Sequence, residues 1–347
     1  MVIVMQPNAS DAEVADVVGH IEANLGKAFV SRGVARTIVG VVGTEEVLET
    51  LDVSGLPGVA ETMRITAPYK LVSAQNATGA AQPRSVVRVG GVPIGPGTFT
   101  LIAGPCAVET AEQTLAAALL ARDAGATLLR GGAFKPRTSP YAFQGLEVAG
   151  LRILADVREE TGLPIVTELV DAADADTVAE YADMVQIGTR NMQNFVLLQA
   201  AGSLGKPVML KRGLTATYEE WLMAAEYIAQ RGNLDIVLCE RGVRSFEPAI
   251  RNMLDVSAVP MMHSLSHLPV IIDPSHAAGR RDLVVPLAKA GIAADADGVM
   301  VDVHADPQYA LCDGAQALNG DALVELGQAV STLPALLGRT SAAHRAG

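Results

Sequence analysis

KPVMLKRGLTATYEEWLMAAEYIAQRGNLDIVLCE, residues 206–240, contains one complete strand–helix–strand unit. The apolar runs KPVMLK and LDIVLCE predict two strands, and TYEEWLMAAEYIAQRG between them has the periodicity of an amphipathic helix. Strands that are apolar along almost their whole length are typical of a parallel sheet buried on both faces. The stretch therefore predicts two parallel strands joined by a helix.

The same rhythm recurs throughout residues 98–340, where strand-like apolar runs alternate with helix-like stretches. We count eight such strands: FTLIAG (99–104), TLLRG (127–131), LPIVTEL (163–169), DMVQIG (183–188), KPVMLK (206–211), LDIVLCE (234–240), LPVIID (268–273) and GVMVDVH (298–304). Eight strand–helix units in about 240 residues predict an α/β fold, a (β/α)8 TIM barrel. An open doubly wound sheet is the alternative, but no glycine fingerprint follows the first strand.

Residues 1–68 have a different pattern and predict a separate domain. Their strands and helices follow the order βαββαβ, which is that of a small ferredoxin-like α+β domain. We expect residues 69–97 to form a linker and a β-hairpin at SVVRVGGVPIG (85–95), because residues 74–97 are rich in Ala, Gly, Pro and Gln. The predicted barrel domain then comprises residues 98–340.

The overall composition excludes several classes of protein. The chain has 347 residues, a formal net charge of −12 and few aromatic residues (4%), which argues against general nucleic-acid binding. No apolar run approaches the ~20 residues of a membrane span, and the N-terminus has no secretory signal. Three cysteines do not indicate a disulfide framework. We therefore expect a cytoplasmic protein that binds neither membrane nor nucleic acid.

Cationic residues follow the predicted strands, and the sequence TLLRGGAFKPRTSP (127–140) is especially rich in them. The C-terminal ends of the strands in a (β/α)8 barrel meet at one face, where the active site lies. Arginine binds phosphate with a planar fork, and lysine adds a compact charge that can donate a proton. Six cations exceed the need of one phosphate, so we predict two anionic substrates. The cations are Arg130, Lys135, Arg137, Arg190, Lys211 and Arg241.

A second group of strand-end residues has the chemistry of metal ligands. It consists of Cys106, His276, Asp302 and Asp313. A thiolate, an imidazole and two carboxylates suit Mn, Fe, Co or Zn better than Mg or Ca. Taken singly, the cysteine could be a small buried hydrophobe and the histidine a loop residue. Their joint placement after the first, seventh and eighth strands favours a metal site.

The remaining histidines and cysteines receive structural interpretations, with two exceptions. His263 and His267 precede the seventh strand and are expected to be structural. His304 lies two residues after Asp302 and should share its side of the strand. Cys312 adjoins Asp313, and it could form a disulfide with Cys106 upon oxidation, whereas Cys239 is expected in the core.

Seven motifs at successive strand ends resemble those of 3-deoxy-D-arabino-heptulosonate 7-phosphate (DAHP) synthases of the short-barrel class I beta type. They are GPCAVE, LRGGAFKPRTSPYAFQGL, VTELVD, IGTRNMQN, LKRG, ERG and LPVIIDPSHAAGRRD. The resemblance covers about residues 85–335, and residues 1–68 are similar to the ferredoxin-like regulatory domain of some members. It implies a metal-dependent 3-deoxy-7-phosphoheptulonate synthase. Such a transferase condenses phosphoenolpyruvate with erythrose 4-phosphate, releases inorganic phosphate, and begins the shikimate pathway to the aromatic amino acids.

The resemblance also implies roles for individual residues. Arg137 and Thr138 would hold erythrose 4-phosphate, and Glu168 and Lys211 would assist the addition of water, with His304 as a further catalytic candidate. Lys135 would protonate the nascent alkoxide. The residues that would hold phosphoenolpyruvate are Arg130, Lys135, Arg190, Lys211 and Arg241. The four metal ligands would be Cys106, His276, Asp302 and Asp313.

The chain departs from the family at Asp302, where the family usually has glutamate. Because aspartate is shorter by one methylene group, we expect an altered metal preference or affinity, not loss of the site. A barrel that has lost catalysis is an alternative that only this residue favours.

The nearest alternative with catalysis is 3-deoxy-manno-octulosonate 8-phosphate synthase, which uses arabinose 5-phosphate. Its motif typically resembles KANRSS, whereas KPRTS stands here (135–139). A fused chorismate mutase would be all-helical, but residues 28–43 are predicted to be strands. We therefore expect residues 1–68 to bind tyrosine or phenylalanine as an inhibitor, and by analogy we expect a homo-oligomer, either a dimer or a tetramer.

Overall fold

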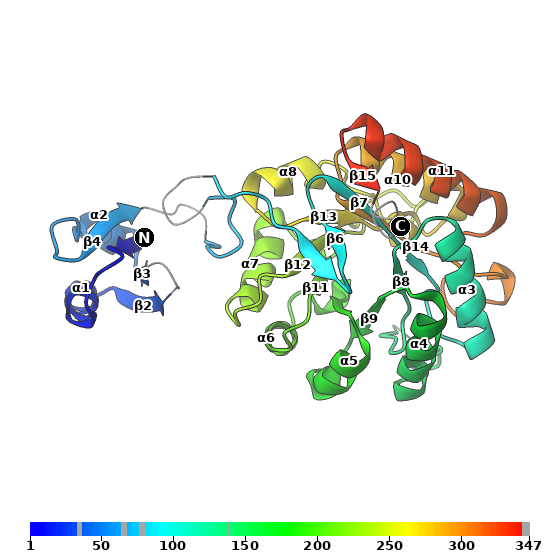
Figure 1. The fold of residues 1–347 in the computed structure, drawn as a ribbon, viewed down its shortest axis with the longest axis horizontal. Helices are drawn as coiled ribbons and strands as arrows, with labels where there is room; N and C mark the ends of the chain where they lie inside the picture. Colours follow the sequence, from blue (N-terminus) through cyan, green and yellow to red (C-terminus); the bar gives the residue numbers. More distant parts are fainter. Residues whose placement is uncertain (33–36, 64–67, 76–80, 138, 342–347) are drawn as a thin grey trace. The chain divides into compact units, whose positions relative to one another are not determined.

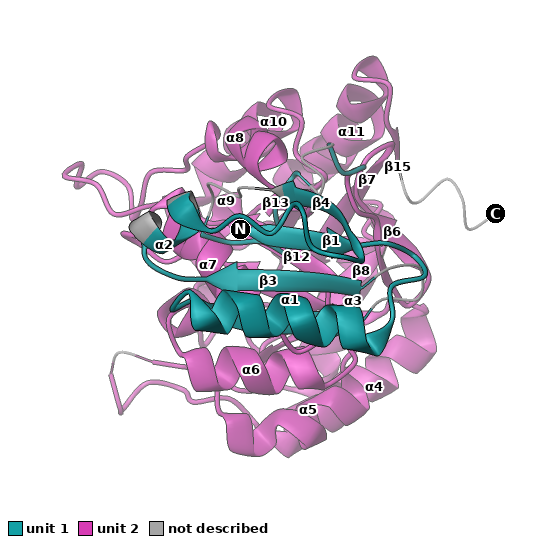
Figure 2. Cartoon of the chain, turned by 90° about the vertical axis from the view of Figure 1, so that its left-hand side faces the viewer, with its two compact units in different colours: residues 1–83 teal, residues 84–347 magenta. Residues whose placement is uncertain are grey.

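The computed structural model describes the chain except for residues 33–36, 64–67, 76–80, 138 and 342–347. The chain divides into two compact units, Met1–Pro83 and Arg84–Gly347 (Figure 2). The first unit comprises the predicted ferredoxin-like domain and residues 69–83 of the segment that the sequence predicts to follow it.

The first unit is a four-stranded antiparallel sheet with two helices. In chain order its elements are β1 (Val2–Met5), α1 (Asp11–Ala23), β2 (Lys27–Arg32), β3 (Thr37–Val42), α2 (Glu45–Thr50) and β4 (Val59–Met63). The strand order β2-β3-β1-β4 confirms the predicted ferredoxin-like domain. Ser10 begins α1 with a capping box. The buried face of this helix, with Val17 and Ile21, packs into the apolar core that includes Ile3 of the sheet.

The second unit contains a closed parallel barrel (Figure 1). Its eight strands are β7 (Thr98–Gly104), β8 (Leu128–Arg130), β9 (Ile165–Leu169), β10 (Met184–Ile187), β11 (Val208–Lys211), β12 (Ile236–Glu240), β13 (Val270–Ile272) and β14 (Gly298–Asp302). Each strand pairs in parallel with the next, and β14 pairs with β7 to close the barrel. The predicted (β/α)8 barrel is confirmed.

Helices connect the strands, as the alternating sequence pattern requires. They are α3 (Ala111–Asp123), α4 (Val148–Thr161), α5 (Ala175–Tyr181), α6 (Phe195–Ser203), α7 (Tyr218–Ala229), α8 (Ala258–Leu265), α9 (Pro274–Ala278), α10 (Arg281–Ala293) and α11 (Gly320–Leu336). Short 3-10 helices lie at Ala172–Asp174, Thr189–Asn191 and Pro307–Tyr309, and β15 (Thr340–Ser341) adds to β7. Among the described residues, we find no helix with the length and apolar character needed to span a membrane.

A β-hairpin of β5 (Val87–Val89) and β6 (Val92–Ile94) packs into the barrel interior. Its turn residues Gly90 and Gly91 both have positive φ, which glycine tolerates and a tight hairpin turn requires. Val87, Val89 and Ile94 are fully buried in one apolar cluster with inward-facing residues of the barrel strands, including Cys239. The hairpin is therefore part of the barrel unit, although the sequence placed it in a linker segment.

Candidate active site

A cavity of about 550 Å³ lies among the C-terminal ends of the barrel strands. All six predicted cations line it, and so do Glu168, His276 and Asp313. The other lining residues are Pro136, Ser139, Ala142, Gln186, Gly188, Thr189, Leu214, Arg244, Arg251, Asn252 and Cys312. A positively charged cavity of this size suits small phosphorylated molecules.

The ends of the barrel strands place these side chains at the cavity. Arg130 and Lys211 are the last residues of β8 and β11, and Arg241 directly follows β12. At the end of β7, Gly104 has a φ of +155°, and a Cβ there would lie 2.1 Å from the Arg130 carbonyl oxygen. Glycine therefore allows the chain to pass close to β8 just before Cys106.

The four predicted metal ligands come together. One ligand atom from each of Cys106, His276, Asp302 and Asp313 lies within 4.8 Å of the others. Cys106 Sγ is 3.8 Å from His276 Nε2 and 3.2 Å from Asp313 Oδ2. His276 Nε2 lies 3.6 Å from Asp302 Oδ2. Thiol, imidazole and carboxylate groups at such spacing fit a divalent transition-metal ion.

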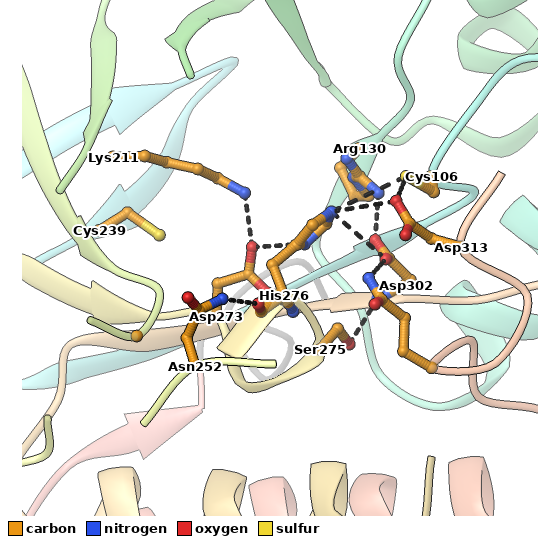
Figure 3. A network of polar contacts seen from close by, with 12 residues as sticks. Cys106, Arg130, Lys211, Cys239, Asn252, Asp273, Ser275, His276, Asp302 and Asp313 are labelled. Carbon is orange, nitrogen blue, oxygen red and sulfur yellow. Dashed lines mark hydrogen bonds and ion pairs between the residues drawn. The ribbon is translucent and has the colours of Figure 1, made fainter. Parts of the chain in front are cut away.

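Asp273 orients His276 toward this cluster (Figure 3). The fully buried Asp273 carboxylate lies 2.8 Å from His276 Nδ1 and accepts a 2.9 Å hydrogen bond from its backbone N–H. Burial lowers the pKa of His276, but the negative charges of Asp273 and Asp302 outweigh this effect and raise that pKa to about 9. The carboxylate–histidine pair leaves Nε2 facing the other three ligands, as in many metal sites.

Asp302 is bound by two protein side chains. Its Oδ1 accepts a short hydrogen bond from Arg130 Nη1, and its Oδ2 accepts one of 2.6 Å from Gln316 Nε2. Asp302 is fully buried, and Arg130 is almost so. Burial lowers the pKa of Arg130, but the Asp302 charge outweighs this effect and the net pKa is raised. One cation predicted to bind substrate therefore pairs directly with a candidate metal ligand.

Two lysines contact the cluster and its supporting residues. Lys135 Nζ donates to the Cys106 carbonyl oxygen at 2.8 Å and lies 3.3 Å from Cys106 Sγ. Burial lowers the pKa of Lys135, but the neighbouring Cys106 and Cys312 groups outweigh this effect and the net pKa is raised. Lys135 therefore carries its proton at neutral pH. Lys211 Nζ donates to Asp273 Oδ2 at 2.5 Å.

Glu168 extends from β9 into the cavity, and a glycine makes room for it. A Cβ at Gly188, just after β10, would lie 2.0 Å from Glu168 Oε1. Glu168 is buried and shares the cavity with Lys211, the partner expected for it.

Of the predicted site residues that the structure describes, Cys106, Asp302 and His304 do not line the cavity, although Cys106 and Asp302 belong to the ligand cluster. Thr138 lies outside the described residues. His304 is not among the lining residues, and its Nε2 lies 3.5 Å from Glu109 Oε2, whereas its Nδ1 accepts from the backbone N–H of Asp306. The predicted structural roles of His263 and His267 agree with their contacts to Asp297 and Ser85.

Several residues that the sequence did not single out complete the site. Gln186, Arg244 and Asn252 line the cavity, and Arg251 Nη2 donates to Asp313 Oδ1 at 3.0 Å. Arg244, Arg251 and Asn252 come from the long segment after β12, in which no periodic pattern marks functional positions. Gln186 alone carried a signal, because it is a polar residue inside an apolar strand.

Comparison with known proteins connects this geometry to a family. Residues 72–337 match the family described as DAHP synthetase I, and residues 1–67 match the DAHP synthase ferredoxin-like domain. A phospho-2-dehydro-3-deoxyheptonate aldolase of Thermotoga maritima is 46% identical over 339 residues, which are 97% of this chain and 99% of that protein. The chain belongs to the DAHP synthetase I family, and it is an enzyme of that family.

Solved structures support the same relation. The crystal structure of the Thermotoga maritima phospho-2-dehydro-3-deoxyheptonate aldolase (DAHP synthase) matches with a TM-score of 0.77 and 45% identity over 98% of each chain. A 2-dehydro-3-deoxyphosphooctonate aldolase of Syntrophotalea carbinolica is 38% identical over 238 residues, covering 63% of this chain and 84% of that protein. This second relation is weaker and shorter, so the octulosonate alternative is not favoured.

Proposed function

We propose that this enzyme condenses phosphoenolpyruvate with erythrose 4-phosphate and water to give DAHP and inorganic phosphate. The observation that carries the proposal is one cavity lined by six cations and by His276 and Asp313, which belong to a cluster of metal-competent side chains. Two phosphorylated substrates account for the number of cations. A metal site beside them accounts for the buried thiol, imidazole and carboxylates.

Phosphoenolpyruvate binds to five of the six cations that line the cavity. The proposed residues are Arg130, Lys135, Arg190, Lys211 and Arg241. Arg137 and Thr138 then bind the phosphate of erythrose 4-phosphate. Anchoring both phosphates aligns the two reacting carbons and lowers the barrier by several kcal/mol through proximity.

A divalent ion held by Cys106, His276, Asp302 and Asp313 would polarise the aldehyde carbonyl or hold the attacking water. The C3 carbon of phosphoenolpyruvate forms a bond to the aldehyde carbon. Lys135, which is charged at neutral pH, gives its proton to the resulting alkoxide oxygen. Water adds at C2, assisted by Glu168 and Lys211, and phosphate leaves from the hemiketal with cleavage of the C2–O bond. His304, which lies 3.5 Å from Glu109 through its Nε2, is a further catalytic candidate.

The first unit is proposed to regulate the barrel. A ferredoxin-like domain of this family without any of the six cations fits an effector site for tyrosine or phenylalanine better than a second catalytic site. We also propose that the protein is a homo-oligomer, either a dimer or a tetramer, and that it is located in the cytoplasm.

The test is to strip the purified chain with chelator and restore Mn, Fe, Co or Zn separately. Loss of phosphoenolpyruvate is then followed with erythrose 4-phosphate or arabinose 5-phosphate. Metal-restored turnover with the four-carbon aldose alone is the expected result. Turnover with only the five-carbon aldose would favour the octulosonate synthase. Absence of turnover in folded protein that binds phosphoenolpyruvate would favour a barrel without catalysis.

A further inference from the structure

Cys312 lies among the candidate metal ligands, although it is not among the four residues that the sequence predicts to bind metal. Its Sγ is 3.5 Å from Cys106 Sγ and 3.4 Å from Asp313 Oδ2. Cys106 Sγ is itself 3.2 Å from the same Asp313 oxygen. The two sulfur atoms and one carboxylate oxygen therefore form a compact triangle of soft and hard donors.

The separation of the two sulfur atoms fits two ligands of one ion. Two thiolates bound tetrahedrally at about 2.3 Å from a zinc ion lie roughly 3.8 Å apart. The observed 3.5 Å is close to that value. The two sulfur atoms are not bonded to each other, since all three cysteines are free in this structure.

Nearby cations can balance the charge of two thiolates. Arg137 Nη1 lies 2.6 Å from Cys312 Sγ, and Lys135 Nζ lies 3.3 Å from Cys106 Sγ. Each sulfur thus has one cationic partner of its own. This arrangement offsets the cost of holding two anionic sulfur atoms in a buried site.

Both carboxylate oxygens of Asp302 are already engaged by side chains outside the cluster. Both of its oxygens already accept hydrogen bonds, one from Arg130 and one from Gln316. Its side chain is also one methylene shorter than the glutamate that the family resemblance leads one to expect. If Asp302 binds a metal ion less strongly for these reasons, a further ligand atom would raise the affinity of the site for the ion.

We propose that Cys312 is a metal ligand, so that the centre carries two thiolates, from Cys106 and Cys312. The inference rests on the metal site of the proposed function and specifies its ligand set. Binding converts the Cys312 thiol to a thiolate and releases its proton to water. Two thiolates favour zinc and other soft or borderline ions over manganese, so Cys312 determines metal selectivity.

Cobalt(II) absorption counts the thiolates directly, without an activity assay. The full chain is reduced with a phosphine, stripped and loaded with Co(II), and the near-ultraviolet sulfur-to-cobalt band is measured per bound cobalt. The variants are C106S, C312S, the double variant and C239S, whose residue lies in the barrel core away from the cluster. Circular dichroism and thermal unfolding establish that each variant is folded.

We expect C106S and C312S each to lose about half of the band, the double variant to lose all of it, and C239S to keep it. Removal of Cys312 should also weaken Zn²⁺ binding relative to Mn²⁺ in a chelator competition. If C312S keeps the full band per cobalt, the proposal is overturned. If the wild type has no such band, or C106S keeps it, the proposed metal site itself is wrong.

X-ray absorption of the zinc-loaded wild type provides a second measurement that needs no variant. Two sulfur neighbours at about 2.3 Å per zinc are expected. One sulfur neighbour would leave Cys106 as the sole thiolate ligand and overturn the role of Cys312. No sulfur neighbour would remove the cysteine site altogether.

Discussion

Lys135 combines two tasks that a single variant cannot separate: it carries positive charge in the cavity, and it holds a proton. Its contacts with the Cys106 carbonyl oxygen and sulfur fix the ammonium group beside the metal-competent cluster. The neighbouring sulfur groups keep it charged despite its burial. A pair of variants, Lys135→Met and Lys135→Arg, therefore tells charge from proton transfer.

We predict that K135M lowers kcat by about 10²–10⁴-fold and raises KM for phosphoenolpyruvate, because it removes both the charge and the acid. K135R should restore much of the KM but not the kcat, since a guanidinium group holds its proton too tightly. Steady-state kinetics of phosphoenolpyruvate consumption measure both constants. A K135R enzyme with wild-type kcat would show that Lys135 is not the acid.

Asp273 contacts the candidate metal site without belonging to the ligand cluster. Its carboxylate binds His276 at both Nδ1 and the backbone N–H and also accepts from Lys211. We predict that D273N lowers metal affinity by about 10–100-fold, as loss of such supporting carboxylates typically does. Competition with a chromogenic chelator measures the affinity.

The matched control is D255N. Asp255 is an acid near the same strand ends, but it pairs with Arg212 and Tyr218 and not with His276. D255N should therefore leave metal affinity unchanged. Equal losses of metal affinity in D273N and D255N would mean that removal of any nearby negative charge weakens binding, and that the orientation of His276 is not the cause.

At this scale the sequence predicted residue types better than their partners. Cys106, His276, Asp302 and Asp313 could be found because they follow strands whose ends must converge in a barrel. The pairing of Arg130 with Asp302 could not, since the two residues are 172 positions apart and the sequence predicts a substrate role for one and a metal role for the other. Gln316 and Arg251 lie on irregular segments, where no periodicity predicts the direction of a side chain.

Among the elements, the segments at the N-terminal side of the barrel are held together by one buried carboxylate. Asp297 precedes β14 and is fully buried. It accepts from Arg84 before β5, from His263 of α8, from the backbone N–H of Val270 in β13 and from Arg339 after α11. Burial raises the pKa of Asp297, but the hydrogen bond from His263 and the charge of Arg84 outweigh it, and the net pKa is lowered.

A lowered carboxyl pKa in the folded state makes stability depend on pH. Ionised Asp297 contributes to the free energy of unfolding above the carboxyl pKa of the unfolded chain, which is about 3.9. This contribution is lost as the pH falls through the lower pKa of the folded protein. We predict that the free energy of unfolding in urea declines below about pH 4, and that D297N costs about 3–5 kcal/mol at pH 7 and makes this decline shallower.

D282N serves as the control, because Asp282 pairs with Arg280 on the exposed surface. Ion pairs on the surface contribute little to the free energy of unfolding, so D282N should leave it almost unchanged. Urea unfolding at pH 7, 5, 4 and 3 gives the comparison. If the free energy of unfolding falls equally steeply with decreasing pH in the wild type and in D297N, carboxylates other than Asp297 cause the decline.

The hairpin shows why domain borders were harder to predict than strands. The order of strands and helices was readable because each has its own periodicity. Whether a hairpin belongs to a linker or to a core depends on contacts with residues far away in the chain. Val87, Val89 and Ile94 bury their side chains against strands that begin up to about 200 residues later, such as β14. Such contacts leave no local trace beyond the apolar residues themselves.

For the molecule as a whole, the division between Pro83 and Arg84 defines where the first unit can be removed. Deletion of residues 1–83 keeps Arg84 with Asp297 and keeps the hairpin in the barrel core. Deletion of residues 1–97 exposes the surface that three fully buried side chains cover, at a cost on the order of 5 kcal/mol. We predict that the shorter deletion leaves a folded, active barrel and that the longer one is strongly destabilised.

Turnover with erythrose 4-phosphate is then assayed with increasing tyrosine or phenylalanine. The full chain should be inhibited and the chain lacking residues 1–83 should not, because the proposed effector site lies in the deleted unit. Inhibition that persists after this deletion would place the effector site in the barrel. Absence of inhibition in the full chain as well would remove the proposed regulatory role while leaving the catalytic proposal intact.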